Sequence, residues 1–175
     1  MRKWYFILSA CILISVIIAF AYDKTGAKEA EPANSLYVSP DGNDQNEGTK
    51  EKPFRTLKQA AKKAVPGTTV MIREGTYHET LDVRESGSAE KPITFQNYEN
   101  EKVVISGESV KDAEYETPLI QIHNQQYITI SGLTIQDLSV SSEEATAMGI
   151  YVSGSSSHIT IKNNHVRDIK TTADD

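Results

Sequence analysis

The stretch Tyr127–Leu138 reads YITISGLTIQDL, and a closely similar line, HITIKNNHVRDI, returns 31 residues later at His158–Ile169. In both copies apolar and polar residues alternate, which is the pattern of a β-strand with one buried face. LIQIHNQQYITI also resembles GIYVSGSSSHITI with one residue inserted, and the triplet ISG at Ile105 recurs after 25 residues at Ile130. Repeats of about 20–50 residues are typical of solenoids and propellers, whose units bury their apolar faces only against their neighbours.

The segments before this repeat have the same character. After Gly67 come several runs of three to five strand-forming residues, separated by Gly, Asn, Asp or Ser: TTVMIREGTY, ETLDV, KPITFQNY and KVVISG. No helical stretch joins them, which argues against a doubly wound sheet. The sequence therefore predicts an all-β right-handed parallel β-helix, in which Ile128 and Ile130 lie below Ile159 and Ile161 of the next coil. A β-sandwich is the alternative, and it accounts for the strands but not for the repeat.

One short amphipathic helix is expected before these strands, in TLKQAAKKAV. Its apolar residues recur at helical spacing: Leu57, Ala60, Ala61 and Ala64. Lysines occupy the other face, so one narrow stripe is predicted to be buried. Thr56 and Gln59 predict a capping box at its start, and Pro66-Gly67 ends it. A stripe made mostly of alanine lets the helix lie close against a flat neighbour, as a cap on the solenoid.

The first residues have the composition of an export signal. MRK places two positive charges before an apolar run that ends in the small-x-small triplet Ala19–Ala21. Residues 1–21 are therefore predicted to be a signal peptide, with an uncleaved membrane anchor and a lipoprotein signal at Cys11 as alternatives. All three place the body of the protein outside the cytoplasm, secreted or anchored at the cell surface, and only this segment would contact a membrane.

The remaining chain divides into two parts. Residues 22–35 are small and charged without an apolar period, which predicts a flexible linker. Residues 36–175 are expected to form the N-terminal coils of the β-helix. Solenoids normally end in capping coils, whereas this chain ends in the polar turn TTADD, so a longer protein is expected.

The charge balance limits the partners. The chain has 18 Lys and Arg against 24 Asp and Glu, a formal net charge of −6. Nucleic acid is excluded as a partner because its binding depends on clustered cations. A polyanionic sugar would be repelled unless a metal ion or a local basic patch intervenes. Cys11 is the only cysteine, so the mature body is expected to contain no disulfide, and we expect a monomer.

The motifs of the entry segment occur in a distinctive order. They are YVSPDG, a turn with Gly48, PFRTL, the alanine-rich helix, PGTTV, GTY and then KPITFQNYENEKVVISG. Together with the strands as far as residue 169, this order resembles secreted bacterial β-helix proteins related to family 9 polysaccharide lyases, the pectate lyases. The resemblance implies calcium-assisted β-elimination on pectate or a related acidic polysaccharide. It also implies that aspartates on successive coils hold Ca²⁺ and that a lysine removes the C5 proton.

The resemblance implies that most of these residues lie on later coils. No counterpart of the catalytic lysine occurs before Asp175, so the catalytic and substrate-binding residues stay unassigned. Asp168, Asp174 and Asp175 are the candidate calcium ligands, because Ca²⁺ takes about six to eight oxygen ligands and these carboxylates are clustered. A solvated corner is the alternative for them. Asp137 precedes Asp168 by 31 residues, so the two could share a cation or cap equivalent turns.

Other polar residues are interpreted as structural. The turn DGNDQNEG at Asp41–Gly48 lacks the EF-hand spacing. The four histidines have no metal-binding spacing and are interpreted as coil corners: His78, His123, His158 and His165. Four asparagines could form an amide stack on successive coils: Asn97, Asn124, Asn163 and Asn164. Tyr127 and Tyr151 could stack on sugar rings if exposed, or pack against the coil.

Two hypotheses for function follow. The first is a secreted, calcium-assisted polysaccharide lyase, and the second is a non-catalytic surface β-helix that binds carbohydrate. A glycoside hydrolase or epimerase is a third possibility within the enzyme class, without identified residues. An aspartate cluster with a nearby Lys or Arg on one flank of consecutive coils would favour the lyase.

Overall fold

The computed structural model describes residues 32–111, 115–141 and 144–172, all within one compact unit, Glu31–Asp175. The predicted signal peptide and most of the predicted linker lie outside the described residues, as do Asp174 and Asp175. Among the helices of the described part, none has the length and hydrophobicity needed to cross a membrane.

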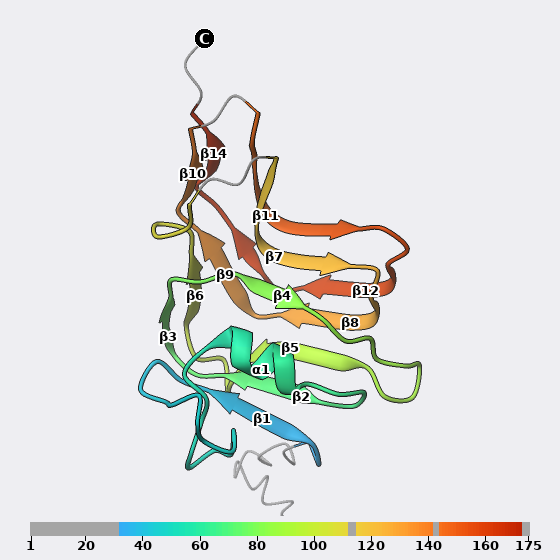
Figure 1. Ribbon diagram of the computed structural model, residues 1–175. Helices are drawn as coiled ribbons and strands as arrows, with labels where there is room; N and C mark the ends of the chain where they lie inside the picture. The colour runs from blue at the N-terminus through green and yellow to red at the C-terminus, as the bar shows by residue number, and fades with distance from the viewer. Residues whose placement is uncertain (1–31, 112–114, 142–143, 173–175) are drawn as a thin grey trace, which may run out of the picture. The chain divides into compact units, whose positions relative to one another are not determined.

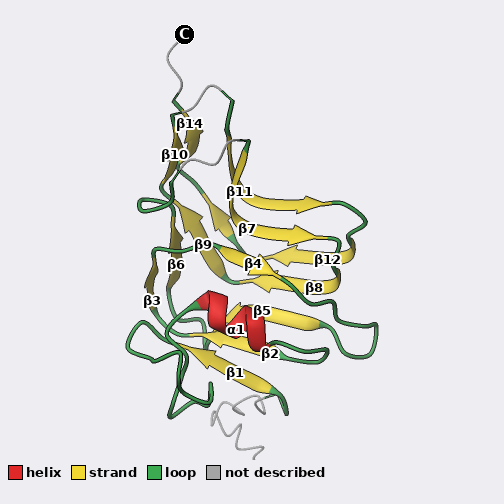
Figure 2. Cartoon of the chain, in the orientation of Figure 1, coloured by secondary structure: helices red, strands yellow, loops and turns green. Residues whose placement is uncertain are grey.

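The described residues form one short helix and many short strands (Figure 2). The elements are β1 (Ser35–Val38), α1 (Leu57–Lys63), β2 (Thr69–Ile72), β3 (Gly75–Tyr77), β4 (Leu81–Val83), β5 (Ile93–Asn97), β6 (Val103–Ser106), β7 (Glu116–His123), β8 (Gln126–Ser131), β9 (Leu133–Gln136), β10 (Leu138–Val140), β11 (Thr146–Ser153), β12 (Ser157–Lys162), β13 (His165–Val166) and β14 (Ile169–Thr171). The predicted length of three to five residues is wrong for β7 and β11, which have eight residues each, for β8 and β12, which have six, and for β13, which has two.

The strands stack as successive coils (Figure 1). A five-stranded sheet has the order β1-β2-β5-β8-β12, a four-stranded sheet β13-β9-β6-β3 and a three-stranded sheet β11-β7-β4, and β10 pairs with β14. The chain visits the sheets in turn, as in β2, β3, β4 and then β5, β6, β7. Every strand pairing among the described residues is parallel. The predicted parallel β-helix with one short helix is confirmed, and the antiparallel β-sandwich is excluded.

The 31-residue repeat is a coil repeat. Ile159 pairs with Ile128 and Ile161 with Ile130, as predicted. The 25-residue match of ISG is not a coil repeat, because Ile105 pairs with Ile135 in the four-stranded sheet while Ile130 lies in the five-stranded sheet. A match of three residues is too short to show which strands occupy equivalent positions in successive coils.

A column of apolar side chains runs through the five-stranded sheet. Register places Leu36, Val70, Phe95, Ile130 and Ile161 one above another. Val70, Phe95 and Ile130 have at most 1% of their surface exposed, whereas Ile161 is 47% exposed. Among the described strands β12 pairs only with β8, so the outer side of Ile161 lacks a neighbouring coil there. The predicted stacking of Ile130 on Ile161 therefore holds in register, but the side chains of this column are fully buried only in the inner coils.

Single residues with left-handed backbone turn the chain at equivalent corners. The residues with positive φ are Asn124 (57°), Tyr127 (56°), Gly132 (74°) and Asp137 (60°) in one coil, and Gly154 (66°), His158 (55°), Asn163 (56°) and Asp168 (54°) in the next. The inserted residue of the repeat falls between Gly154 and His158, where Ser155 N donates to Asn124 Oδ1 at 2.8 Å. The repeat therefore preserves the corners as well as the core.

The predicted asparagine stack is wrong. Gly132 lies between Asn97 of the preceding coil and Asn163 of the next, and a Cβ atom on it would overlap Asn97 Oδ1. Asn97 Nδ2 instead donates to Glu101 O at 3.0 Å, and Asn164 bonds the backbone of Leu133 at 2.9 Å. Asn97 therefore satisfies a nearby backbone carbonyl, and Asn164 satisfies a backbone amide of the preceding coil.

The helix buries the predicted stripe and packs against β4 and β1. The exposed fractions of its apolar residues are at most 2%: Leu57, Ala60, Ala61 and Ala64. Thr56 caps it by accepting from Gln59 N at 3.1 Å, but Gln59 does not return the bond. Thr56 N donates to Asp44 Oδ1 at 2.9 Å instead, so the Asp41–Gly48 turn supplies the second half of the cap. The reciprocal capping box predicted from the sequence is therefore wrong.

Candidate functional site

Asp168 lies at the left-handed corner between β13 and β14, one coil away from the equivalent Asp137. Leu138 N donates to Asp168 O at 3.1 Å across the two coils. Arg167 Nη1 donates to Asp168 Oδ2 at 2.6 Å, and Arg167 Nη2 bonds Gln136 Oε1. Gln136 in turn donates to Asp137 Oδ2. The two carboxylates therefore share a network with one arginine, at a turn position that Asp favours.

This corner by itself does not fit a calcium ion. Ca²⁺ takes about six to eight oxygen ligands, and here an arginine already binds Asp168. Within residues 32–111, 115–141 and 144–172, the side chains of His, Cys, Asp and Glu form no group of three that could hold a metal. Asp174 and Asp175 lie outside the described residues, so calcium binding by Asp168, Asp174 and Asp175 stays a prediction.

The histidines serve local contacts. His123 Nδ1 lies 2.9 Å from Ser153 Oγ, and Asn124 Nδ2 lies 2.7 Å from His123 Nε2. Asn124 Nδ2 can only donate, and its Oδ1 accepts from Ser155 N, so His123 Nε2 accepts and Nδ1 carries the proton toward Ser153. This tautomer does not activate a serine nucleophile, which needs an unprotonated ring nitrogen beside its hydroxyl. The exposed His158 stacks on Tyr127, with ring centroids 4.3 Å apart.

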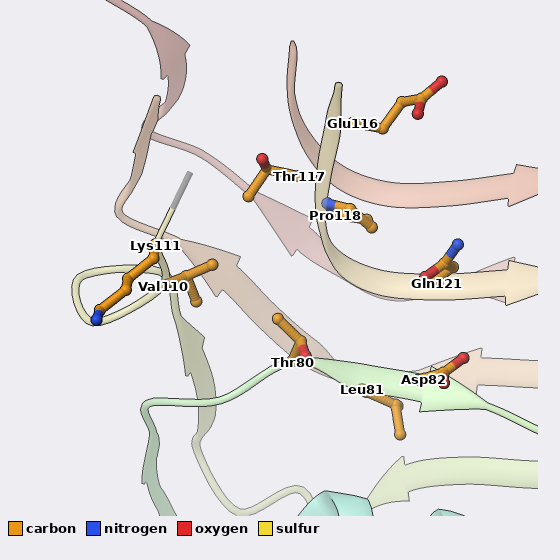
Figure 3. Close-up of a pocket in the computed structure, with 9 residues that line it drawn as sticks. All are labelled: Thr80, Leu81, Asp82, Val110, Lys111, Glu116, Thr117, Pro118 and Gln121. Carbon is orange, nitrogen blue, oxygen red and sulfur yellow. The ribbon is translucent and has the colours of Figure 1, made fainter. Parts of the chain in front are cut away.

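The outer face of the three-stranded sheet is hollowed. A pocket of about 200 Å³ lies over β4 and β7 (Figure 3), and its lining is Thr80, Leu81, Asp82, Val110, Lys111, Glu116, Thr117, Pro118 and Gln121. Asp82 pairs in register with Gln121, and Figure 3 shows their side chains one above the other on adjacent strands. The Lys111 side chain points away from both of them in that view.

A second hollow of about 250 Å³ continues the first toward the helix. It is lined by Lys58, Thr80, Asp82, Arg84 and Gln121. Three residues, Thr80, Asp82 and Gln121, line both hollows, so the two form one depression, which we call the sheet groove. Its first half has an apolar wall, and its second half is lined by polar and charged side chains.

Two cations are held at the polar half of the sheet groove. Arg84 Nε lies 3.0 Å from Asp82 Oδ2, with both side chains about half exposed. Lys58 is placed by the first turn of α1, whose backbone amides at Leu57 and Lys58 donate to the Glu79 carboxylate at 3.0 and 3.3 Å. Burial raises the pKa of Glu79, although these two amide bonds act in the opposite direction. The helix that presents Lys58 is thus anchored to the segment just before β4.

The sequence reasoning missed the residues of the sheet groove. Asp82 in LDV and Gln121 in IQI are the outward residues between two inward apolar ones, which is the available signal. Lys58 was placed on the polar face of the helix, but the approach of that face to the three-stranded sheet depends on the packing of α1 on β4. Asp137 and Asp168 lie on consecutive coils beside Arg167, but among the described residues they are not part of a cluster of three acidic side chains, so the aspartate cluster expected to favour a lyase stays a prediction.

Comparison with known proteins relates this chain to one family of β-helix proteins. Residues 36–173 match the family described as Pel9A-like, right handed beta helix region. The chain is 75% identical over all 175 residues to YwoF of Bacillus subtilis (strain 168), and it spans 37% of that protein. Over 80 residues, 45% of this chain and 20% of the relative, it is 39% identical to the pectate lyase PEL9 of Emericella nidulans. A solved rhamnogalacturonan lyase superposes with a TM-score of 0.66 at 21% identity, over 80% of this chain and 37% of that one, which shows the shared fold.

Proposed function

We propose, because the chain belongs to the Pel9A-like right-handed β-helix family, that it is part of a secreted lyase acting on pectate or a related polyuronate. The reaction proposed is calcium-assisted β-elimination. The observation that carries the proposal is the 39% identity to a pectate lyase over 80 residues. The chain spans about a third of its Bacillus relative, so the activity is proposed for the complete protein.

The chemistry requires three contributions. In β-elimination on a uronate a base takes the proton at C5, the C4–C5 double bond forms, and the glycosidic C4–O bond breaks. The negative charge that develops beside the carboxylate must be stabilised, and the leaving oxygen must take up a proton. Bound Ca²⁺ would supply that stabilisation. Among the described residues we assign neither the base nor a complete set of calcium ligands. The contribution of these coils is to bind and orient the sugar chain on the outer face of the solenoid.

The test measures ultraviolet absorbance of unsaturated uronide products from polygalacturonate. The complete gene product and residues 22–175 are compared, each with Ca²⁺ and with EDTA. We expect a calcium-dependent signal from the complete protein. No product from the complete protein with either pectate or other polyuronates would contradict the proposal.

A second candidate function is non-catalytic carbohydrate binding at the cell surface. The sheet groove favours it, because the groove combines an apolar wall with polar side chains and with cations presented by a helix and a sheet. Binding of a polysaccharide by the complete protein without any product formation would favour this second function.

A further inference from the structure

The cations of the sheet groove differ from Arg73 and Lys50, whose charged groups are bonded within the fold. Arg73 makes a bidentate contact with Glu101 at 2.9–3.2 Å, and its guanidinium lies 4.9 Å from the ring centroid of Tyr98. Lys50 lies over the same ring at 4.8 Å and bonds the Tyr98 hydroxyl. Those two cations fasten the entry loop and neighbouring coils to one another. Their bonding capacity is used inside the fold.

Lys58 and Arg84 are oriented toward a hollow instead. Both side chains are exposed, and both line the polar half of the sheet groove. Among the described residues, the ammonium of Lys58 makes no hydrogen bond and no ion pair. The guanidinium of Arg84 is paired only through Nε, with Asp82. The guanidinium has five N–H donors, so Nη1 and Nη2 of Arg84 stay available to a ligand. Lys58 and Arg84 together with Asp82 give this half of the groove one net positive charge, which one carboxylate would balance.

We propose that the sheet groove is a binding site for one carboxylate of a uronate-containing oligosaccharide, held by Lys58 and Arg84 without a metal ion. The inference rests on the substrate class of the proposed function, and it goes beyond that function by assigning an anchoring site. The protein carries a net charge of −6, so a polyuronate needs a local positive site. The polar half of the groove supplies one, because its two cations exceed its single carboxylate, Asp82.

The remaining residues of the groove fit the hydroxyl groups of a sugar. Gln121 offers both an amide donor and a carbonyl acceptor, Thr80 offers a hydroxyl, and Asp82 is an acceptor fixed by Arg84. The side chains of Asp82 and Gln121 belong to neighbouring strands, which lie about 4.8 Å apart. A sugar ring with its carboxylate toward Lys58 can therefore contact two strands at once.

The site is built where α1 packs against β4, the end strand of the three-stranded sheet. β4 pairs with β7, and β7 pairs on its other side with β11, so the sheet under the groove is continuous. The helix that presents Lys58 is fixed at its N-terminus by the carboxylates of Asp44 and Glu79. This anchoring limits the side-chain ordering that ligand binding would require.

The test is a calorimetric or NMR titration of the protein with short saturated oligogalacturonate in EDTA at low salt. The variants are Lys58→Gln and Arg84→Gln. Lys62→Gln is the matched control, because Lys62 is an exposed lysine on the same helix that does not line the groove. All four proteins are first compared by melting temperature, and the exposed positions predict unchanged values.

Saturable binding in EDTA is expected, with each groove variant weakening the affinity about three- to tenfold and Lys62→Gln leaving it unchanged. The methyl ester of the same oligosaccharide carries no carboxylate charge. Its affinity for the wild-type protein should therefore be no higher than the affinity of the unesterified sugar for the groove variants. Equal affinities in Lys58→Gln and Lys62→Gln, binding only with Ca²⁺, or no saturable binding would each overturn the inference. Lyase activity is read separately, so an inactive protein that binds in EDTA refutes the lyase proposal alone.

Discussion

The side chain of Ile130 lies inside the apolar column of the five-stranded sheet, with Phe95 on one side and Ile161 on the other. It is fully buried, so Ile130→Asp would place a carboxylate where no partner is available. We expect a loss of about 3–5 kcal/mol, sufficient to unfold a domain of ordinary stability. Circular dichroism and thermal melting check this expectation.

The matched control for Ile130→Asp is Thr129→Asp. Thr129 immediately precedes Ile130 in β8. It is only half-buried, because alternate residues of a strand face opposite sides. The Thr129→Asp variant should retain the fold and melt close to the wild-type temperature. If Ile130→Asp melts like this control, the burial of the column does not stabilise the fold as described.

Gly132 has a role that depends on its lack of a side chain. Its φ is +74°, and a Cβ atom would overlap the amide of Asn97, whose nitrogen is bonded to Glu101 O. Gly67 also has positive φ, at +89°, but a Cβ atom there meets only ordinary contacts with Lys91. Gly132→Ala should therefore reduce the free energy of unfolding by about 1 kcal/mol more than Gly67→Ala does. Denaturant unfolding of the two variants measures this difference, and equal losses would show that Asn97 adapts without cost.

At the scale of elements, the start of α1 connects three segments of the chain. Asp44 accepts from the backbone of Arg55 and Thr56 at 2.9 Å, and Glu79 accepts from Leu57 at 3.0 Å. These bonds satisfy amides that a helix leaves without internal partners. The helix of seven residues is too short to be stable alone, so these contacts and its buried stripe hold it in place.

Glu79 should make stability depend on pH. Burial raises its pKa in the folded state above the unfolded value of about 4.3, so folding favours the protonated form. Its contribution is therefore fully present below pH 4 and is lost as pH rises through the raised pKa. The stability of wild type relative to Glu79→Gln should fall as pH rises from about 4.3 through the raised pKa. Chemical denaturation of both proteins across this range checks the sign, and a difference that rises with pH would contradict it.

The sequence predicted the elements better than their connections. Alternation identified β2, β5, β8 and β12, and the lysine-and-alanine pattern identified α1, because both signals depend on burial of one face. The strands β10 and β14 were missed, since they follow the preceding strand after only one residue for β10 and two for β14. The cap of α1 was only half predicted, because Asp44 and Glu79 reach it through tertiary structure.

At the scale of the whole molecule, stability should vary from coil to coil. β5 and β8 pair with strands on both sides, while β12 pairs on one side among the described strands and carries the exposed Ile161. In a solenoid each coil is stabilised mainly by its neighbours. Backbone amides of β5 and β8 should therefore exchange with solvent more slowly than those of β12. Hydrogen-exchange mass spectrometry of this chain tests the order, and uniform protection would indicate a single cooperative unit.

The functional site was less accessible to sequence reasoning than the fold. The sheet groove combines Lys58 of a helix, Asp82 and Arg84 of one coil, and Gln121 of the next. No local spacing relates a helix to an outer sheet face, so this combination follows only from the packing of α1 on β4. By contrast, the relation of Asp137 to Asp168 was readable from the 31-residue repeat, because it depends on register alone.

The left-handed corners have an evolutionary consequence. Each recurs at the same place in the next coil, so a tandem duplication of one coil length joins a corner to its own copy and leaves the path of the backbone unchanged. An ancestral gene could lengthen by such duplications without passing through an unfolded intermediate sequence. Every added copy would also add one side chain to each row of outward-facing residues. Selection could then vary the exterior while the corners stayed constant.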